Sequence, residues 1–122
     1  MRNGQHDDER LTWAAATAND IDRFYGERPS PTMKAIAIRR GDQPVAIIGM
    51  FMDGQRMRAF SEYIPEFEPH LRSMTVLRAI KAAQRMFDES PRPVIAVKGS
   101  DSGILERIGF VPVADEVYKW PS

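Results

Sequence analysis

The stretch Glu68-Pro69-His70-Leu71-Arg72-Ser73-Met74-Thr75-Val76-Leu77 joins an extended segment to the longest helical pattern in the chain. Ser73 is a good N-cap residue. Apolar side chains then recur on one stripe at helical spacing, namely Val76, Ile80, Ala83 and Phe87, with Met74 and Leu77 beside them. The first amides of a helix lack intrahelical acceptors, and the helix dipole adds partial positive charge there. This junction is therefore where we expect an anionic ligand to bind.

The residues before the junction predict an antiparallel meander. Three runs have the alternation or the continuous apolar character of strands: 34–40, 45–52 and 56–63. Gly41-Asp42 predicts the first turn. Asp53-Gly54 is a strong hairpin signal, because both central positions of such a turn need positive φ. Pro65 ends the third strand, since proline donates no backbone hydrogen bond.

The N-terminal region predicts a short strand followed by a short helix. Residues 1–10 are polar and charged, and we expect them to form a flexible tail. Residues 11–16 fit a strand, although their alanines leave a helix open. Thr17 and Asp20 have the spacing of a helix start, in which the hydroxyl accepts from the first turn and the carboxylate favours the positive end of the dipole. Gly26 then ends a helix that carries three apolar side chains on one face: Ile21, Phe24 and Tyr25.

The residues after the long helix predict the rest of the sheet. Residues 94–97 are too few for a helix and too apolar for an edge strand, so they predict a central strand. A right-handed crossover through the long helix pairs this strand parallel to residues 56–63. Residues 104–108 fit a short helix that Gly109 ends in the left-handed conformation, and residues 111–120 predict a last strand.

Composition excludes several classes of protein. Seventeen basic residues balance seventeen acidic ones, so no bulk field favours nucleic acid or an anionic membrane. The chain has no cysteine and only two histidines, His6 and His70, which argues against a metal cluster. No apolar run is long enough to span a bilayer. We expect a single domain over residues 11–122, located in the cytoplasm, with no metal, nucleic-acid partner or membrane association.

Two stretches of the sequence resemble the GCN5-related N-acetyltransferase superfamily. Residues 16–21, Ala-Thr-Ala-Asn-Asp-Ile, are similar to the family's passage from first strand to first helix. Residues 102–113, Ser-Gly-Ile-Leu-Glu-Arg-Ile-Gly-Phe-Val-Pro-Val, are closely similar to its late helix, Gly-Phe corner and final strand. With the matching order of elements, the resemblance covers residues 11–120. It implies an α/β fold in which an antiparallel meander and a parallel central pair form one mixed sheet, with helices on both faces.

The resemblance implies acetyl-CoA as acyl donor and an amine, on a small molecule or a protein, as acceptor. CoA would lie in a cleft between residues 60–64 and 94–98, with its pantetheine arm along Glu62–Ile64 and its pyrophosphate on the long helix's N-terminus. The implied cofactor-binding residues are Tyr63, Ile64, Arg72, Ser73, Met74 and Thr75. Glu62 stands where the family sometimes places a general base.

The sequence departs from the family pattern at two places. In the family's Arg/Gln-x-x-Gly-x-Gly/Ala loop, Arg72 takes the basic position, but Thr75 and Leu77 replace the small residues. Leu105 replaces a late-helix tyrosine that often protonates the departing thiolate. The alternative to an acetyltransferase is therefore a catalytically inactive module of the same fold, which binds a protein partner in a larger assembly such as a phage particle, where it would be virion-associated.

Further side chains near the predicted cleft are candidates for proton transfer. His70 would be a base near neutral pH, and either Tyr63 or Tyr118 could replace the missing tyrosine acid. Four arginines of the predicted meander form either a basic patch, if the strand ends adjoin, or a solvated face: Arg39, Arg40, Arg56 and Arg58.

Overall fold

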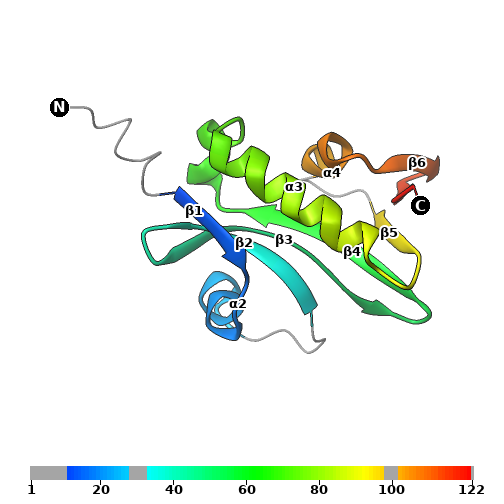
Figure 1. Ribbon diagram of the computed structural model, residues 1–122, viewed down its shortest axis with the longest axis horizontal. Helices are drawn as coiled ribbons and strands as arrows, with labels where there is room; N and C mark the ends of the chain where they lie inside the picture. Colours follow the sequence, from blue (N-terminus) through cyan, green and yellow to red (C-terminus); the bar gives the residue numbers. More distant parts are fainter. Residues whose placement is uncertain (1–10, 28–32, 98–101, 122) are drawn as a thin grey trace.

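A mixed sheet organises the chain, whose computed structural model describes residues 11–27, 33–97 and 102–121, excepting the side chains of residues 102–104 (Figure 1). The predicted tail, residues 1–10, lies outside the described residues. The described strands form one sheet in the order β1-β2-β3-β4-β5-β7-β6. The elements in chain order are β1 (Leu11–Ala15), α2 (Ala18–Tyr25), β2 (Met33–Arg40), β3 (Gln43–Asp53), β4 (Arg56–Tyr63), the 3-10 helix η1 (Pro65–His70), α3 (Met74–Asp88), β5 (Val94–Val97), α4 (Ser102–Ile108), β6 (Val111–Ala114) and β7 (Val117–Lys119).

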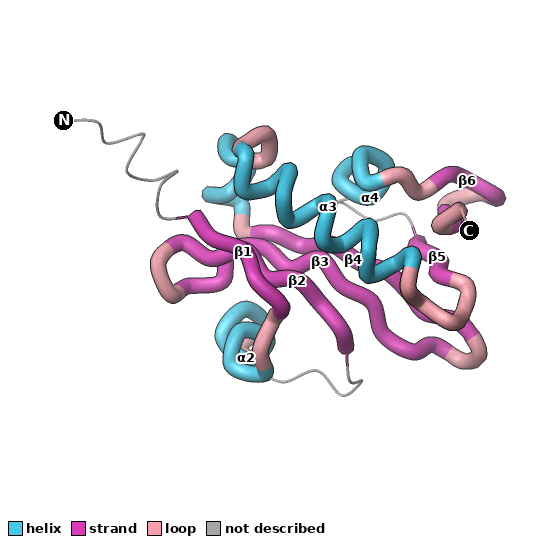
Figure 2. The backbone as a smooth tube through the Cα atoms, viewed as in Figure 1, coloured by secondary structure: helices cyan, strands magenta, loops and turns pink. Residues whose placement is uncertain are grey.

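The helices cover both faces of the sheet. Helix α2 lies on one face, and α3 and α4 lie on the other (Figures 1 and 2). The larger core fills the space between the sheet and α3 and α4, where Phe67, Phe87 and Ile108 are almost completely buried. A smaller core beneath α2 joins Ile21 to Ala37 and Ile47. This arrangement confirms the predicted α/β class with helices on both faces.

The meander forms as predicted, with one shift at its second turn. Strands β2, β3 and β4 pair antiparallel. Asp53 pairs with Arg56, so the central residues of the turn are Gly54 and Gln55 rather than Asp53 and Gly54. Gly54 adopts a φ of 68°, the left-handed conformation that its lack of a Cβ allows.

Helix α3 begins where the sequence predicts and carries the chain across to a parallel strand. The Ser73 side chain caps it by accepting from the Val76 N–H at 3.3 Å. The predicted stripe is buried, but Met74 and Leu77 beside it are 61% and 40% exposed. Strand β5 then pairs parallel with β4, which confirms the predicted parallel pairing.

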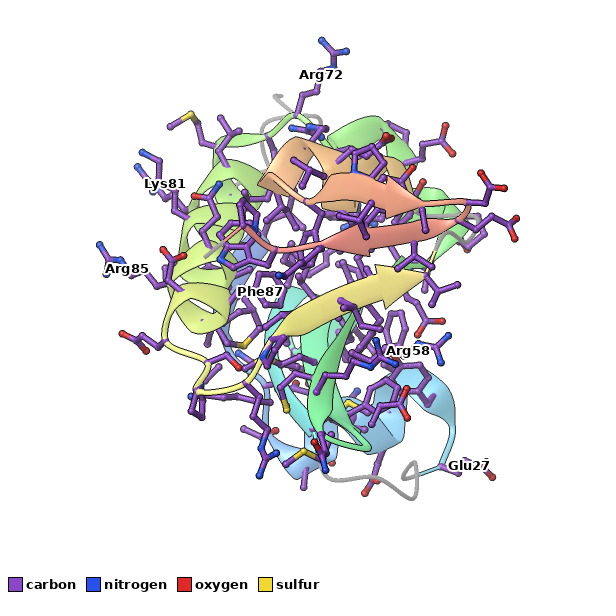
Figure 3. The ribbon with its side chains drawn as sticks, turned by 90° about the vertical axis from the view of Figure 1, so that its right-hand side faces the viewer. Glu27, Arg58, Arg72, Lys81, Arg85 and Phe87 are labelled. Carbon is purple, nitrogen blue, oxygen red and sulfur yellow. The ribbon has the colours of Figure 1, made fainter. Side chains whose placement is uncertain are left out.

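The C-terminal strand is a hairpin, not the single strand predicted for residues 111–120. Strands β6 and β7 pair antiparallel, and β7 lies between β5 and β6. Glu116 in the turn has a φ of 60°, so the chain reverses without a glycine or proline to mark the place. Beyond β7, Trp120 packs against Phe110 and Phe87, with ring centroids 5.3 Å and 5.6 Å away. Figure 3 shows Phe87 in the interior between α3 and the C-terminal strands.

Candidate functional site

The parallel pairing of β4 with β5 is short. It joins Met57 to Val94, Arg58 to Ile95 and Ala59 to Ala96, and among the described residues it goes no further. Strand β4 runs on to Tyr63 and pairs with β3 along its whole length, from Arg56 to Tyr63. Among the described residues, β4 and β5 therefore pair only along the first part of β4, and residues 60–63 lie beyond these pairs.

Backbone direction along the rest of β4 follows from its register with β3. The Ile64 N–H donates to the Val45 carbonyl at 3.0 Å, so the backbone groups of Ile64 face β3. Because these groups alternate along an antiparallel strand, those of Glu62 also face β3, whereas those of Ser61 and Tyr63 face the side of β5. Of the residues predicted to meet a pantetheine arm, Tyr63 thus points its backbone toward the side of β5, whereas Glu62 and Ile64 point theirs toward β3.

Glu62 is paired with a tyrosine from α2. The Tyr25 hydroxyl donates to Glu62 Oε1 at 2.6 Å, from a half-buried position at the end of the helix. Burial raises the pKa of the Tyr25 phenol well above its ordinary value, and the hydrogen bond to the Glu62 carboxylate raises it further. The phenol therefore stays protonated near neutral pH, and it acts as a donor that orients the carboxylate.

Helix α2 is fixed in place by a polar network at its start. The Asp20 carboxylate accepts from the Thr17 N–H at 2.8 Å, and the Asp20 N–H donates to the Thr17 hydroxyl, which is the predicted helix start realised as a capping box. The Arg39 guanidinium, from β2, makes two hydrogen bonds to the same carboxylate. These contacts, led by the hydrogen bond from Arg39, lower the pKa of Asp20 to about 2. The network fixes the position of α2, the helix that places Tyr25 next to Glu62.

The N-terminus of α3 presents the other predicted cofactor residues. Met74 and Thr75 supply its first amides, which have no acceptor within the helix. Thr75 directs its hydroxyl to the Leu11 carbonyl at 3.3 Å, toward β1 and not toward the helix start. The exposed Arg72 side chain extends away from the body of the molecule (Figure 3).

A second arginine, which no pattern in the sequence predicts, reaches this loop. Arg107 Nη1, from α4, donates to the Leu71 carbonyl at 3.1 Å and so holds α4 against the approach to α3. No local pattern marks this contact, because the two residues are 36 positions apart.

The remaining candidates have structural contacts. His70 packs against Phe67 with ring centroids 5.8 Å apart. The Tyr118 hydroxyl donates to Glu106 Oε2 at 3.4 Å, and Leu105 is buried in the core with 4% of its surface exposed.

The four arginines of the meander do not form one basic patch. Arg39 and Arg40 lie beside the start of β3, and Arg39 is ion-paired with Asp20. Arg56 and Arg58 lie beside the end of β3, where Arg58 is 3.9 Å from Asp53. The length of β3 therefore separates the two pairs.

Comparisons with solved structures identify the fold. An acyl-CoA N-acyltransferase from Pseudomonas aeruginosa is similar over 89% of this chain and 95% of its own, with 14% identity and a TM-score of 0.53. An acetyltransferase from Thermus thermophilus is similar over 92% and 97%, with 16% identity and a TM-score of 0.56. The chain has the GCN5-related N-acetyltransferase fold. Ard1 from Thermoplasma volcanium is similar over 90% and 95%, with 13% identity and a TM-score of 0.56.

No protein-family model matches the sequence, and no curated protein matches it. Within the described residues, no group of three or more His, Asp or Glu side chains is arranged to hold a metal ion. None of the helices in that part of the chain is long and apolar enough to cross a membrane.

Proposed function

We propose that the protein transfers an acetyl group from acetyl-CoA to an amine. The observation that carries the proposal is the hydrogen bond by which Tyr25 holds Glu62, on the part of β4 beyond the β4–β5 pairs that the described residues form. The likeness to acyl-CoA N-acyltransferase and acetyltransferase structures supports the same assignment at the level of the fold.

The chain offers two features that fit the donor. An extended arm would lie along Phe60–Tyr63, next to the backbone that faces β5. A pyrophosphate would lie at the N-terminus of α3, close to the amides of Met74 and Thr75, with Arg72 able to approach from solvent. The Thr75 side chain, which is bonded toward β1, leaves those amides uncontested by its hydroxyl.

The transfer needs little from protein side chains. Acetyl-CoA supplies a thioester, whose C–S bond breaks as the amine nitrogen bonds to the carbonyl carbon, and the thiolate that leaves takes a proton from solvent. Glu62 accepts the proton that the amine must lose, directly or through one water. Tyr25 orients the carboxylate by donating its hydroxyl proton, and its raised pKa keeps that proton in place.

Titration calorimetry with acetyl-CoA and with CoA tests the donor site. We expect saturable binding of both, and the absence of heat and of a thermal shift at millimolar ligand would refute the proposal.

The Glu62→Gln substitution tests the base. We expect this variant to bind acetyl-CoA as the wild type does and to lose about 100-fold or more in kcat, because the amide cannot accept the proton. Glu66→Gln, on the exposed part of η1, is the matched control and should leave kcat unchanged. Full activity of Glu62→Gln would show that another group removes the proton.

A catalytically inactive module remains the second candidate. Leu105 offers no hydroxyl where the family often has its acid, and several apolar side chains are exposed as a partner-binding surface would require: Met74, Leu77, Val111 and Val113. On this hypothesis the protein binds a partner and shows no turnover of acetyl-CoA with any amine. Turnover with one amine would exclude it.

A further inference from the structure

A hollow of about 400 Å³ lies beside α2, at the end of the sheet where β2 turns into β3. Two arginines line it, Arg23 from α2 and Arg40 from the end of β2. Apolar walls come from Phe24, Pro44 and Ile64. The hollow thus combines two cations with an apolar lining, and none of the residues assigned above to the donor site except Ile64 contributes to it.

Arg40 carries an unsatisfied donor. Its Nε is buried, and no described residue accepts a hydrogen bond from it. The preceding residue, Arg39, shows the usual solution, since its guanidinium is bonded to the Asp20 carboxylate. A buried N–H without an acceptor is costly. Because Arg40 lines the hollow, a ligand bound there that accepts from its guanidinium would offset this cost.

Arg23 also lines the hollow and adds a second positive charge. Its Nη1 donates to the Asp42 carbonyl at 3.1 Å, which fixes the side chain without neutralising it. No carboxylate of the described residues is ion-paired with Arg23 or Arg40. Because a guanidinium matches a carboxylate in shape and charge, a carboxylate is the group that this pair would bind best. The apolar walls then suit a short hydrocarbon chain attached to it.

The hollow adjoins the Glu62–Tyr25 pair through two elements. Phe24, in its wall, precedes Tyr25 in α2, and Ile64 follows Glu62 by two residues. Two residues of extended chain span about 7 Å. An acceptor with its amine at Glu62 could therefore reach the hollow with the other end of a short chain.

From this juxtaposition we infer that the acyl acceptor is an amine that also carries a carboxylate. The carboxylate lies between Arg23 and Arg40, the hydrocarbon chain contacts Phe24 and Ile64, and the amine faces Glu62. This inference rests on the proposed acetyl transfer for the role of the amine. The carboxylate site itself depends only on the hollow and its two arginines.

Binding of hexanoate in the absence of any CoA tests the carboxylate site. We expect calorimetry to show saturable binding of hexanoate to the wild-type protein and at least tenfold weaker binding of 1-hexanol. Arg40→Met should weaken hexanoate binding at least tenfold, and Arg23→Met, at an exposed side chain, provides a second variant if Arg40→Met does not fold. Arg78→Met, on the exposed side of α3, is the matched control and should bind as the wild type does. Equal binding to the wild type and to a folded Arg40→Met or Arg23→Met variant, or no binding at all, would overturn the inference.

Turnover then tests the role of the site in acceptor choice. With acetyl-CoA as donor, we expect at least one ω-amino acid of three to six carbons to have a kcat/KM at least tenfold above that of hexylamine. The Arg40→Met variant should lose this preference. Turnover of hexylamine as fast as of every amino acid would refute the inference and leave the acetyl transfer standing. Hexanoate binding without turnover of any amine would refute the acetyl transfer and support the carboxylate site.

Discussion

Asp20 couples the stability of the protein to pH. It is 3% exposed, and hydrogen bonds from Arg39 and Thr17 lower its pKa from 3.8 to about 2. Because the folded state holds the carboxylate more acidic than the unfolded state does, the stabilisation is complete above about pH 4 and is lost as the pH falls toward 2. The difference in pKa corresponds to about 2 kcal/mol in the free energy of unfolding.

The Asp20→Asn substitution should remove this pH dependence. Urea unfolding at pH 6 and at pH 2.5 is expected to show that the variant is less stable by about 2 kcal/mol or more at pH 6, where Arg39 is left without its counter-ion, with a much smaller difference at pH 2.5. Asp53→Asn, which removes an exposed ion pair at 3.9 Å, should cost well under about 1 kcal/mol at either pH. An equal loss at both pH values would contradict the assignment of the pKa shift to Asp20.

Gly49 is required by close packing and not by its backbone conformation. A Cβ at this position would lie 2.7 Å from the Cβ of Ala35 and 2.9 Å from the carbonyl oxygen of Lys34, both in β2. We expect Gly49→Ala to lower the free energy of unfolding by about 1–3 kcal/mol, because the strands must move apart. Gly54→Asn, in the open β3–β4 turn, should be nearly neutral, since asparagine tolerates positive φ. Urea denaturation measures the free energy of unfolding of both variants, and equal values would contradict the role of close packing at Gly49.

At the scale of elements, the C-terminal segment is attached to α3 by polar as well as apolar contacts. Trp120 Nε1 donates to Asp88 Oδ1 at 2.8 Å, and Gln84 Nε2 donates to the Ile108 carbonyl at 2.7 Å. Together with the packing of Phe87 and Phe110, these bonds hold α3 against the segment that follows α4. The long helix is thus fixed to both halves of the sheet.

Trp120→Phe should weaken this attachment. We expect a loss of about 2 kcal/mol in the free energy of unfolding, from the missing hydrogen bond and the smaller ring. Trp13→Phe is the matched control, because Trp13 is 39% exposed on β1, and it should cost less than about 0.5 kcal/mol. Circular dichroism in urea is the suitable measurement, since both changes alter tryptophan fluorescence. Equal losses of stability in the two variants would contradict the role of Trp120 in attaching the C-terminal segment to α3.

At the scale of the whole molecule, the sequence predicts the order of elements because most of them carry local signals. Alternation and turn residues predict the meander, and Ser73 predicts the start of α3. The final hairpin was missed because Glu116 takes a left-handed φ of 60° that a residue other than glycine rarely adopts. The loose alternation of apolar and polar residues over 111–120 therefore predicts one strand instead of two.

The candidate site could be predicted only in part for a related reason. Glu62 and the first amides of α3 are marked by nearby residues. The contact of Tyr25 with Glu62 joins positions 37 apart, and the unsatisfied Nε of Arg40 depends on which neighbours the fold brings near it. Such long-range contacts follow from the packing of α2 on the sheet, which no short stretch of sequence encodes.

The short β4–β5 ladder has a mechanical consequence. Eight residue pairs join β2 to β3, and eight join β3 to β4, but only three join β4 to β5 in the described residues. A force that pulls β4 and β5 apart would therefore be resisted by a much shorter ladder than the one that joins β4 to β3. Rupture of this ladder would divide the sheet into a four-stranded part and a three-stranded part.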